Sequence, residues 1–171
     1  MKLLMTVLVS LLLSATPAVS QDLTDLYRSS VSRTPYVVFA ARAGAPGHAF
    51  VVLGEELDNG LLFNLGVYGF YPKDGKASVI KALFGTDGQI TFKWEDLDRD
   101  VFFRRNIDAQ QRGRVLAVLE RWSDGNYSLL GNNCNSLAAE VGRVIGLTLP
   151  NDKPGTTLPV NFMKALKAAN P

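Results

Sequence analysis

The chain of 171 residues contains a single cysteine, Cys134, and a single histidine, His48. One cysteine excludes an internal disulfide, so the packed core alone must hold the fold together. The same scarcity argues against a zinc site, which takes three or four protein ligands, and no Asp or Glu stands at a spacing that completes one. We therefore expect no metal and no cofactor, and a thiol that is either buried or kept for chemistry.

An excess of charge of either sign is also missing. Lys and Arg number 18 and Asp and Glu 16, and Lys2 is the one basic residue among the first 20. The charges are interleaved, and Arg104-Arg105 is the densest basic point. This pattern predicts no nucleic-acid partner, because such partners require a basic face. The chain also lacks a P-loop, a G-x-G-x-x-G fingerprint and the G-x-S-x-G elbow of serine hydrolases.

Long hydrophobic runs are confined to the N-terminus. Met1-Lys2 is followed by an apolar stretch over 3–13 and by Ala18-Val19-Ser20, which has the spacing of a cleavage site. The apolar stretch is short for a membrane span, which needs about 20 residues. We interpret residues 1–20 as a secretory signal peptide cut before Gln21. The prediction is a secreted or periplasmic protein with no stable membrane anchor after cleavage and a single domain over 21–171.

The remaining residues predict an α+β fold, with a mostly antiparallel sheet and helices packed on it. Runs rich in β-branched and aromatic residues predict strands at 36–42, 48–57, 61–72, 89–94 and 100–107. Asn59-Gly60 predicts a two-residue hairpin turn. Helices are expected at 79–84, from Asp108 to about 122, at 134–145 and at 160–169, and residues 22–35 form a short helix or an irregular arm.

The stretch "GNNCNSLAAEVGRVIGL" places Cys134 at the start of a helix. Apolar residues recur on one face of it, Asn132 or Asn133 is a candidate cap, and Gly146 ends it. Cys134 lies on that apolar face, so it should point at the sheet. The first turn has unpaired N–H groups and the positive end of the helix dipole, which stabilise an anion. This setting predicts a thiol pKa below the free value of about 8.5.

A cysteine nucleophile needs a base, and His48 is the one imidazole in the chain. It opens a predicted strand after "AGAPG", whose glycines should leave the ring accessible. A Cys at a helix N-terminus and a His on a strand form the pair expected for nucleophilic acyl transfer. The alternative is that Cys134 is a small core residue and His48 a structural residue.

Four segments together resemble a known family: "PGHAFVVLG", "GFYP", "YSLLGNNCNSLAAEVGRVIGL" and "LPVNF". They are similar to the circularly permuted NlpC/P60-like branch of the papain-like superfamily, in which the His strand precedes the Cys helix. The resemblance implies a permuted papain-like fold, with Cys134 as nucleophile and His48 as base. It also implies a third polar residue on the next strand, which orients the imidazole.

Asn64 is the best candidate for that third residue by type and place. With a two-residue turn, however, Asp58 pairs with Leu61, and strand alternation turns Asn64 to the face opposite His48. A longer loop or a bulge is needed to bring it round, and Tyr71, which this register places beside His48, is an alternative, as is a backbone carbonyl. For the oxyanion or the substrate, the candidates are Asn133, Asn132, nearby backbone N–H groups and Tyr71.

The function expected from the resemblance is that of a cysteine peptidase or amidase, acting on a peptide or cell-wall-type substrate. Two alternatives stay open. One is a non-catalytic module on the same fold that binds peptides or glycans. The other is a lipid acyltransferase in which "LLFNLGVYGFY" lines an apolar cleft, although this composition is also ordinary for a strand.

Overall fold

The computed structural model describes residues 25, 27–29, 32–45, 47–73, 79–151 and 153–171. The predicted signal peptide lies outside this range, as do residues 22–24, 26 and 30–31 of the predicted helix or irregular arm at 22–35. Residues 25 and 27–29 of the arm are helical, whereas Arg33 to Pro35 already belong to the first strand. None of the described helices is long and apolar enough to cross a membrane.

Six strands form one antiparallel sheet in the order β5-β1-β2-β3-β4-β6, which confirms the α+β prediction. Their bounds are β1 Arg33–Arg42, β2 His48–Leu57, β3 Leu62–Pro72, β4 Thr86–Thr91, β5 Val101–Asn106 and β6 Asn126–Tyr127. The strand predicted at 89–94 begins and ends three residues earlier, because Trp94 starts a 3-10 turn, η1 (Trp94–Leu97). The two-residue β6 was not predicted.

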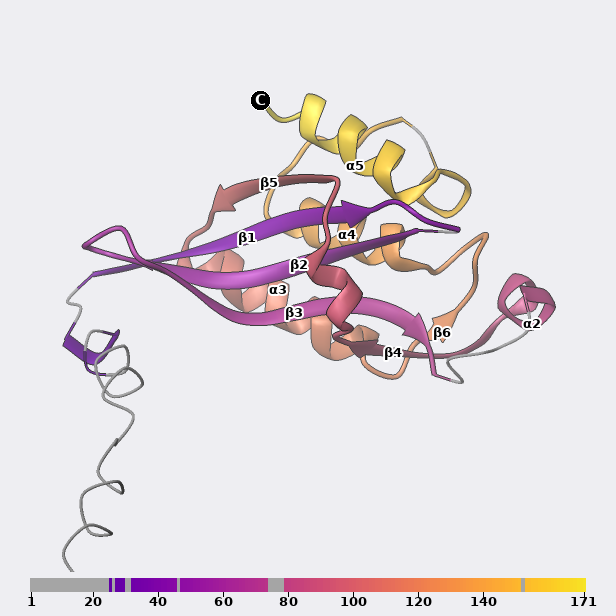
Figure 1. The fold of residues 1–171 in the computed structure, drawn as a ribbon, viewed down its shortest axis with the longest axis horizontal. Coiled ribbons are helices and arrows are strands. Elements are labelled where there is room, and N and C mark those ends of the chain that lie inside the picture. Colours follow the sequence, from indigo (N-terminus) through magenta and orange to yellow (C-terminus); the bar gives the residue numbers. More distant parts are fainter. Residues whose placement is uncertain (1–24, 26, 30–31, 46, 74–78, 152) are drawn as a thin grey trace, which may run out of the picture.

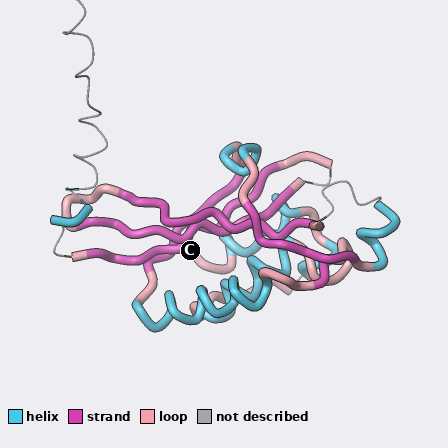
Figure 2. The backbone as a smooth tube through the Cα atoms, turned by 90° about the horizontal axis from the view of Figure 1, so that it is seen from below, coloured by secondary structure: helices cyan, strands magenta, loops and turns pink. Residues whose placement is uncertain are grey.

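The helices are α2 (Val79–Phe84), α3 (Ala109–Trp122), α4 (Cys134–Val144) and α5 (Pro159–Ala168), with a second 3-10 turn, η2 (Pro154–Thr156). The predicted capping box starts α3, where Asp108 Oδ1 accepts from Gln111 N at 2.6 Å. Helices α3, α4 and α5 cover one face of the sheet, whereas η1 lies on the other (Figures 1 and 2).

The β2–β3 hairpin has a three-residue loop, so the predicted two-residue turn is wrong. Leu57, not Asp58, pairs with Leu61, through a bond of 2.9 Å from its N–H to the Leu61 carbonyl. Gly60 takes a φ of +81°, which glycine adopts without strain. A bulge between Leu53 and Gly54 then shifts the register, so that Phe50 pairs with Gly69 further along.

Strand β2 packs on both of its faces. Ala49, Val51 and Leu53 belong to the main core, which is shared with the helices. Phe50 and Val52 belong to a second, small cluster on the helix-free face, together with Ala40. Successive side chains of a strand alternate between faces, so each residue of β2 is assigned to one side of the sheet.

Candidate active site

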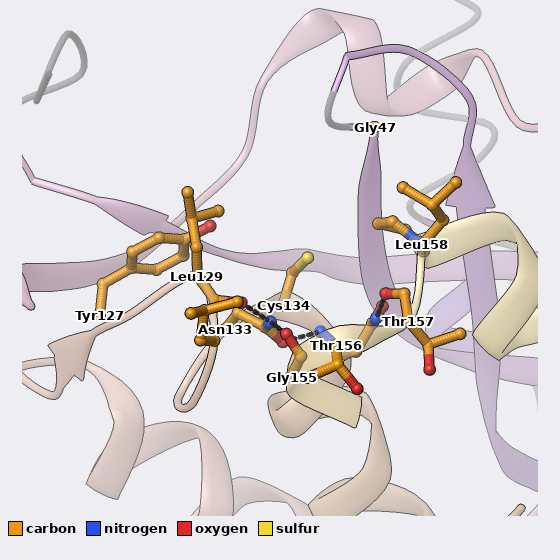
Figure 3. A pocket seen from close by; sticks show the side chains of 12 residues that line it. Gly47, Tyr127, Leu129, Asn133, Cys134, Gly155, Thr156, Thr157 and Leu158 are labelled. Atoms are coloured by element: carbon orange, nitrogen blue, oxygen red, sulfur yellow. Dashed lines mark hydrogen bonds between the residues drawn. The ribbon is translucent and has the colours of Figure 1, made fainter. Parts of the chain in front are cut away.

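Cys134 is the first residue of α4 and part of the main core, as its place on the apolar stripe predicts. Asn133 caps the helix, since its Oδ1 accepts from Asn135 N at 3.0 Å and from Ser136 N at 3.2 Å. The backbone N–H groups of Ala49, Asn135 and Cys134 itself lie near the sulfur and act to lower the pKa of the thiol. Figure 3 shows the sulfur projecting from the helix into the space between Tyr127 and Leu158.

Burial decides the ionisation of this thiol. Cys134 is 6% exposed, and desolvation raises its pKa to about 11. The three backbone N–H groups act in the opposite direction and do not offset the burial, while the Asp96 carboxylate raises the pKa further. The prediction of a lowered pKa is therefore wrong, because a helix N-terminus stabilises an anion less than this core destabilises it.

His48 opens β2 as predicted, but its ring is buried rather than accessible. The residue is 4% exposed, and its ring stacks on Tyr71 with centroids 3.9 Å apart. Burial, together with the charges of Arg42 and Lys93, lowers the imidazole pKa to about 3. Its Nε2 is buried and has no hydrogen-bond partner among the described residues. The bare backbone of Gly69 leaves the space that this nitrogen occupies, since a Cβ there would lie 2.4 Å from it.

The imidazole and the thiol lie on opposite faces of β2. His48 stacks with Phe50 on the helix-free face, whereas Cys134 packs with Ala49 on the helix face. Within the described residues no hydrogen bond joins Sγ to the ring. The two residues are nevertheless close along the backbone, because the Ala49 N–H that acts to lower the pKa of the thiol belongs to the peptide bond that His48 forms with Ala49.

Asn64 lies on the His48 face, because the three-residue loop pairs it with Gly54 instead of Glu55, but it is far along the strand. It pairs with Gly54, six residues beyond His48, which corresponds to about 20 Å of strand. Its Oδ1 accepts from the Tyr36 hydroxyl at 2.8 Å. The residue that contacts the imidazole is Tyr71, as the register predicts.

A buried carboxylate completes this end of the sheet, and the sequence reading missed it. Asp96, 1% exposed in η1, accepts from the Tyr71 hydroxyl at 2.5 Å, from Lys93 N at 3.2 Å and from Arg42 Nε at 3.4 Å. Burial and then the bond to Asp96 raise the pKa of Tyr71. "EDLDR" reads as a polar turn, and nothing in it distinguishes Asp96 from its exposed neighbours.

The asparagines around Cys134 have separate tasks. Asn133 is occupied, because besides capping α4 it donates from Nδ2 to the Leu129 carbonyl at 2.7 Å. Asn132 is exposed and lines another pocket, beside Glu140. Asn135, not singled out from the sequence, donates to the Pro154 and Thr157 carbonyls, and its Oδ1 is buried without a partner among the described residues. Asn133 is therefore already engaged in capping and loop contacts, and Asn132 is not among the residues that line the Cys134 pocket.

Two adjoining pockets form one cleft around the end of β2. The first, of about 150 Å³, contains Cys134 and Asn135, and the second, of about 280 Å³, contains His48, Tyr71, Arg42 and Lys93. Gly47, Tyr127 and Leu129 line both. The cleft thus connects the thiol on one face with the imidazole on the other.

The described residues contain no group of three or more His, Cys, Asp or Glu side chains placed to hold a metal ion.

Comparison of the chain with protein-family models, with curated proteins and with solved structures found no match.

Proposed function

We propose that this chain is a secreted or periplasmic thiol hydrolase, which cleaves an amide bond in a peptide or cell-wall-type substrate with Cys134 as the nucleophile. The observation that supports this most is the setting of the sulfur. It heads α4 and lines a cleft, and the backbone N–H groups of Ala49, Asn135 and Cys134 act to lower the pKa of the thiol. Groups of this kind favour the thiolate, which is the nucleophilic form of cysteine.

The proposed reaction starts from a neutral thiol and a neutral imidazole. His48 takes the Sγ proton while the sulfur bonds to the acyl carbon, and the carbonyl oxygen becomes an oxyanion. When the C–N bond breaks, the leaving amine takes the proton from the imidazolium. Water then attacks the thioester, which releases the acid and restores the thiol.

This reaction requires the His48 ring to leave its stack on Tyr71. Because His48 and Cys134 lie on opposite faces of β2, the ring also has to turn round the end of this strand, where His48 is the first residue. Leaving the buried position also removes the desolvation that holds the imidazole pKa near 3. The pKa then returns toward 6.5, which suits a base at neutral pH.

The test is acyl-enzyme formation. Purified protein is incubated with peptidoglycan fragments and with a panel of peptides, and both the products and the intact mass of the protein are measured. We expect turnover that is lost in Cys134→Ser, which keeps the size of the side chain, and in His48→Ala. Equal product from wild type and Cys134→Ser would contradict the proposal. A lasting fatty thioester after exposure to lipid donors would instead assign lipid acyl transfer.

A second candidate is a non-catalytic module that binds peptides or glycans in the same cleft. The observation in its favour is the resting state, in which a protonated thiol and an unprotonated imidazole share no hydrogen bond. Ligand binding that survives the double variant Cys134→Ala with His48→Ala, without turnover by the wild type, would support this function over hydrolysis.

A further inference from the structure

The part of the cleft beyond His48 carries an unbalanced positive charge. Two cations line it, Arg42 and Lys93. Arg42 bonds to Asp96 through Nε at 3.4 Å. None of the ion pairs among the described residues involves Lys93, whose ammonium lies 4.0 Å from the centroid of the Tyr71 ring. The nearby carboxylate therefore balances one cation of the two.

Asp96 cannot easily turn to Lys93 as well. Its side chain is fully buried and already accepts from the Tyr71 hydroxyl, Arg42 Nε and the backbone N–H of Lys93. His48, the remaining titratable group of this pocket beside the tyrosines, is neutral at physiological pH because burial holds its pKa at about 3. The ammonium of Lys93 is thus left to pair with a group that enters the cleft.

A second polar group in this pocket also lacks a partner. His48 Nε2 is buried without a hydrogen bond to any described residue, in a residue that is 4% exposed. A buried polar atom left unpaired is unfavourable unless a ligand or a movement of the ring satisfies it. An uncompensated cation beside an unsatisfied imidazole indicates a site for an anion with hydrogen-bonding oxygens.

We propose that Lys93 and Arg42 bind a carboxylate of the substrate, so that Cys134 acts on acyl compounds carrying a free carboxylate close to the scissile bond; this inference rests on the proposed function. The volume of about 280 Å³ accommodates a short chain ending in a carboxylate. One uncompensated cation matches the single charge of a carboxylate better than the double charge of a phosphate. The shared walls at Gly47, Tyr127 and Leu129 connect this end of the cleft with the thiol.

The test measures binding without chemistry, in the Cys134→Ser variant of the full chain. The probes are glutaramate, a short chain with a carboxylate at one end and an amide at the other, and glutaramide, in which both ends are amides. His48 is the single histidine, so its ring signals in an NMR spectrum are assigned without ambiguity. We expect glutaramate to shift these signals in a saturable way and glutaramide to leave them unchanged.

Lys93→Gln in the same background should weaken glutaramate binding by about tenfold or more, the loss expected for one charge-assisted hydrogen bond. The control is Lys167→Gln, which removes the same charge from the exposed side of α5 and should change nothing. In the Cys134→Ser variant itself, added salt should weaken binding, which tests the charge without relying on the fold of Lys93→Gln.

Equal binding of the two probes, an unaltered affinity in Lys93→Gln, or inorganic phosphate competing better than glutaramate would each overturn this inference. Because the assay needs no thiol, its result does not depend on turnover. Turnover of neutral substrates with no glutaramate binding would refute the carboxylate site and leave the proposed function standing. Glutaramate binding in a chain that shows no turnover would support the site and contradict the hydrolase.

Discussion

The reactivity of Cys134 toward iodoacetamide tests the balance between burial and the helix N-terminus directly. The thiolate is the form that reacts, and its fraction follows from the pKa. Burial moves that pKa from 9.0 to about 11. At pH 7 a shift of two units leaves about a hundredfold less thiolate than an ordinary cysteine has. Alkylation of the folded chain should therefore be at least that much slower than alkylation of the unfolded chain.

The assay follows the intact mass over time from pH 6 to pH 10, with the same chain in concentrated urea as the reference. The single cysteine makes one added group the complete reaction. We expect the folded rate to rise about tenfold per pH unit without a plateau below pH 10, because ionisation limits it. His48→Ala should leave the profile unchanged, since the ring does not contact the sulfur in the resting state.

A folded chain that reacts faster than the unfolded chain at pH 6 would refute this reasoning. That result would mean a stabilised thiolate, and a loss of the fast reaction in His48→Ala would identify the imidazolium as its partner. The active protein would then rest as an ion pair, with the His48 ring turned to the helix side of the sheet.

Three further changes test the site and its surroundings. The wild type should lose about 5 kcal/mol of unfolding free energy as the pH falls from 6.5 to 3, because the His48 imidazole takes up a proton in the unfolded chain at a higher pH than in the folded chain. Urea unfolding at pH 7 and at pH 4 measures this loss, and the unfolding free energy of His48→Gln should depend less on pH. Gly69→Ala should lower the melting temperature and move the His48 ring signals, because the new Cβ would lie 2.4 Å from Nε2 and 2.7 Å from Tyr71 Cε2. Asn64→Ala should cost about 1 kcal/mol of stability by removing the bond from Tyr36, with no change in Cys134 alkylation; a changed rate would show that Asn64 acts on the site.

The sequence was sufficient for the elements with strong local signals. The apolar run with β-branched and aromatic residues in "HAFVVLGEEL" predicts β2 with its bounds, and the spacing of Asp108 and Gln111 predicts the start of α3. The apolar stripe from Cys134 predicts both α4 and the packing of the thiol on the sheet. These features depend on residues within one or two turns of each other, so a single chain displays them.

Features that depend on several strands at once were not predictable in this way. The bulge at Gly54 occurs where a side chain would collide with the Tyr36 ring, since a Cβ there would lie 2.3 Å from it. The three-residue loop pairs Asn64 with Gly54, which reverses the alternation argument, and the bulge then restores the predicted pairing of His48 near Tyr71. The burial of His48 depends likewise on Tyr71, which reaches it from the neighbouring strand.

Asp96 links the two faces of the sheet electrostatically, and its neutralisation gives the last prediction. Its carboxylate binds Tyr71 and Arg42 on the helix-free face. Burial is the largest cause of the raised pKa of Cys134, and the charge of Asp96 raises this pKa further. Asp96→Asn should therefore lower the pKa of Cys134 and speed alkylation at pH 8. The exposed Asp98→Asn is the matched control.

Stability should change in the opposite sense to reactivity. Asp96→Asn leaves the partly exposed guanidinium of Arg42 without its carboxylate partner and replaces the acceptor of the Tyr71 hydroxyl by a neutral amide, which should cost on the order of 1–3 kcal/mol. The alkylation is therefore measured well below the urea midpoint of the variant, so that global unfolding does not supply the reactive thiol. If the rate then equals that of Asp98→Asn, the carboxylate does not act on the sulfur across the sheet. A faster rate would mean that a substrate anion in the same cleft also makes the thiol harder to ionise, unless the cations that bind it compensate. That compensation is the effect expected of Lys93 in the carboxylate site.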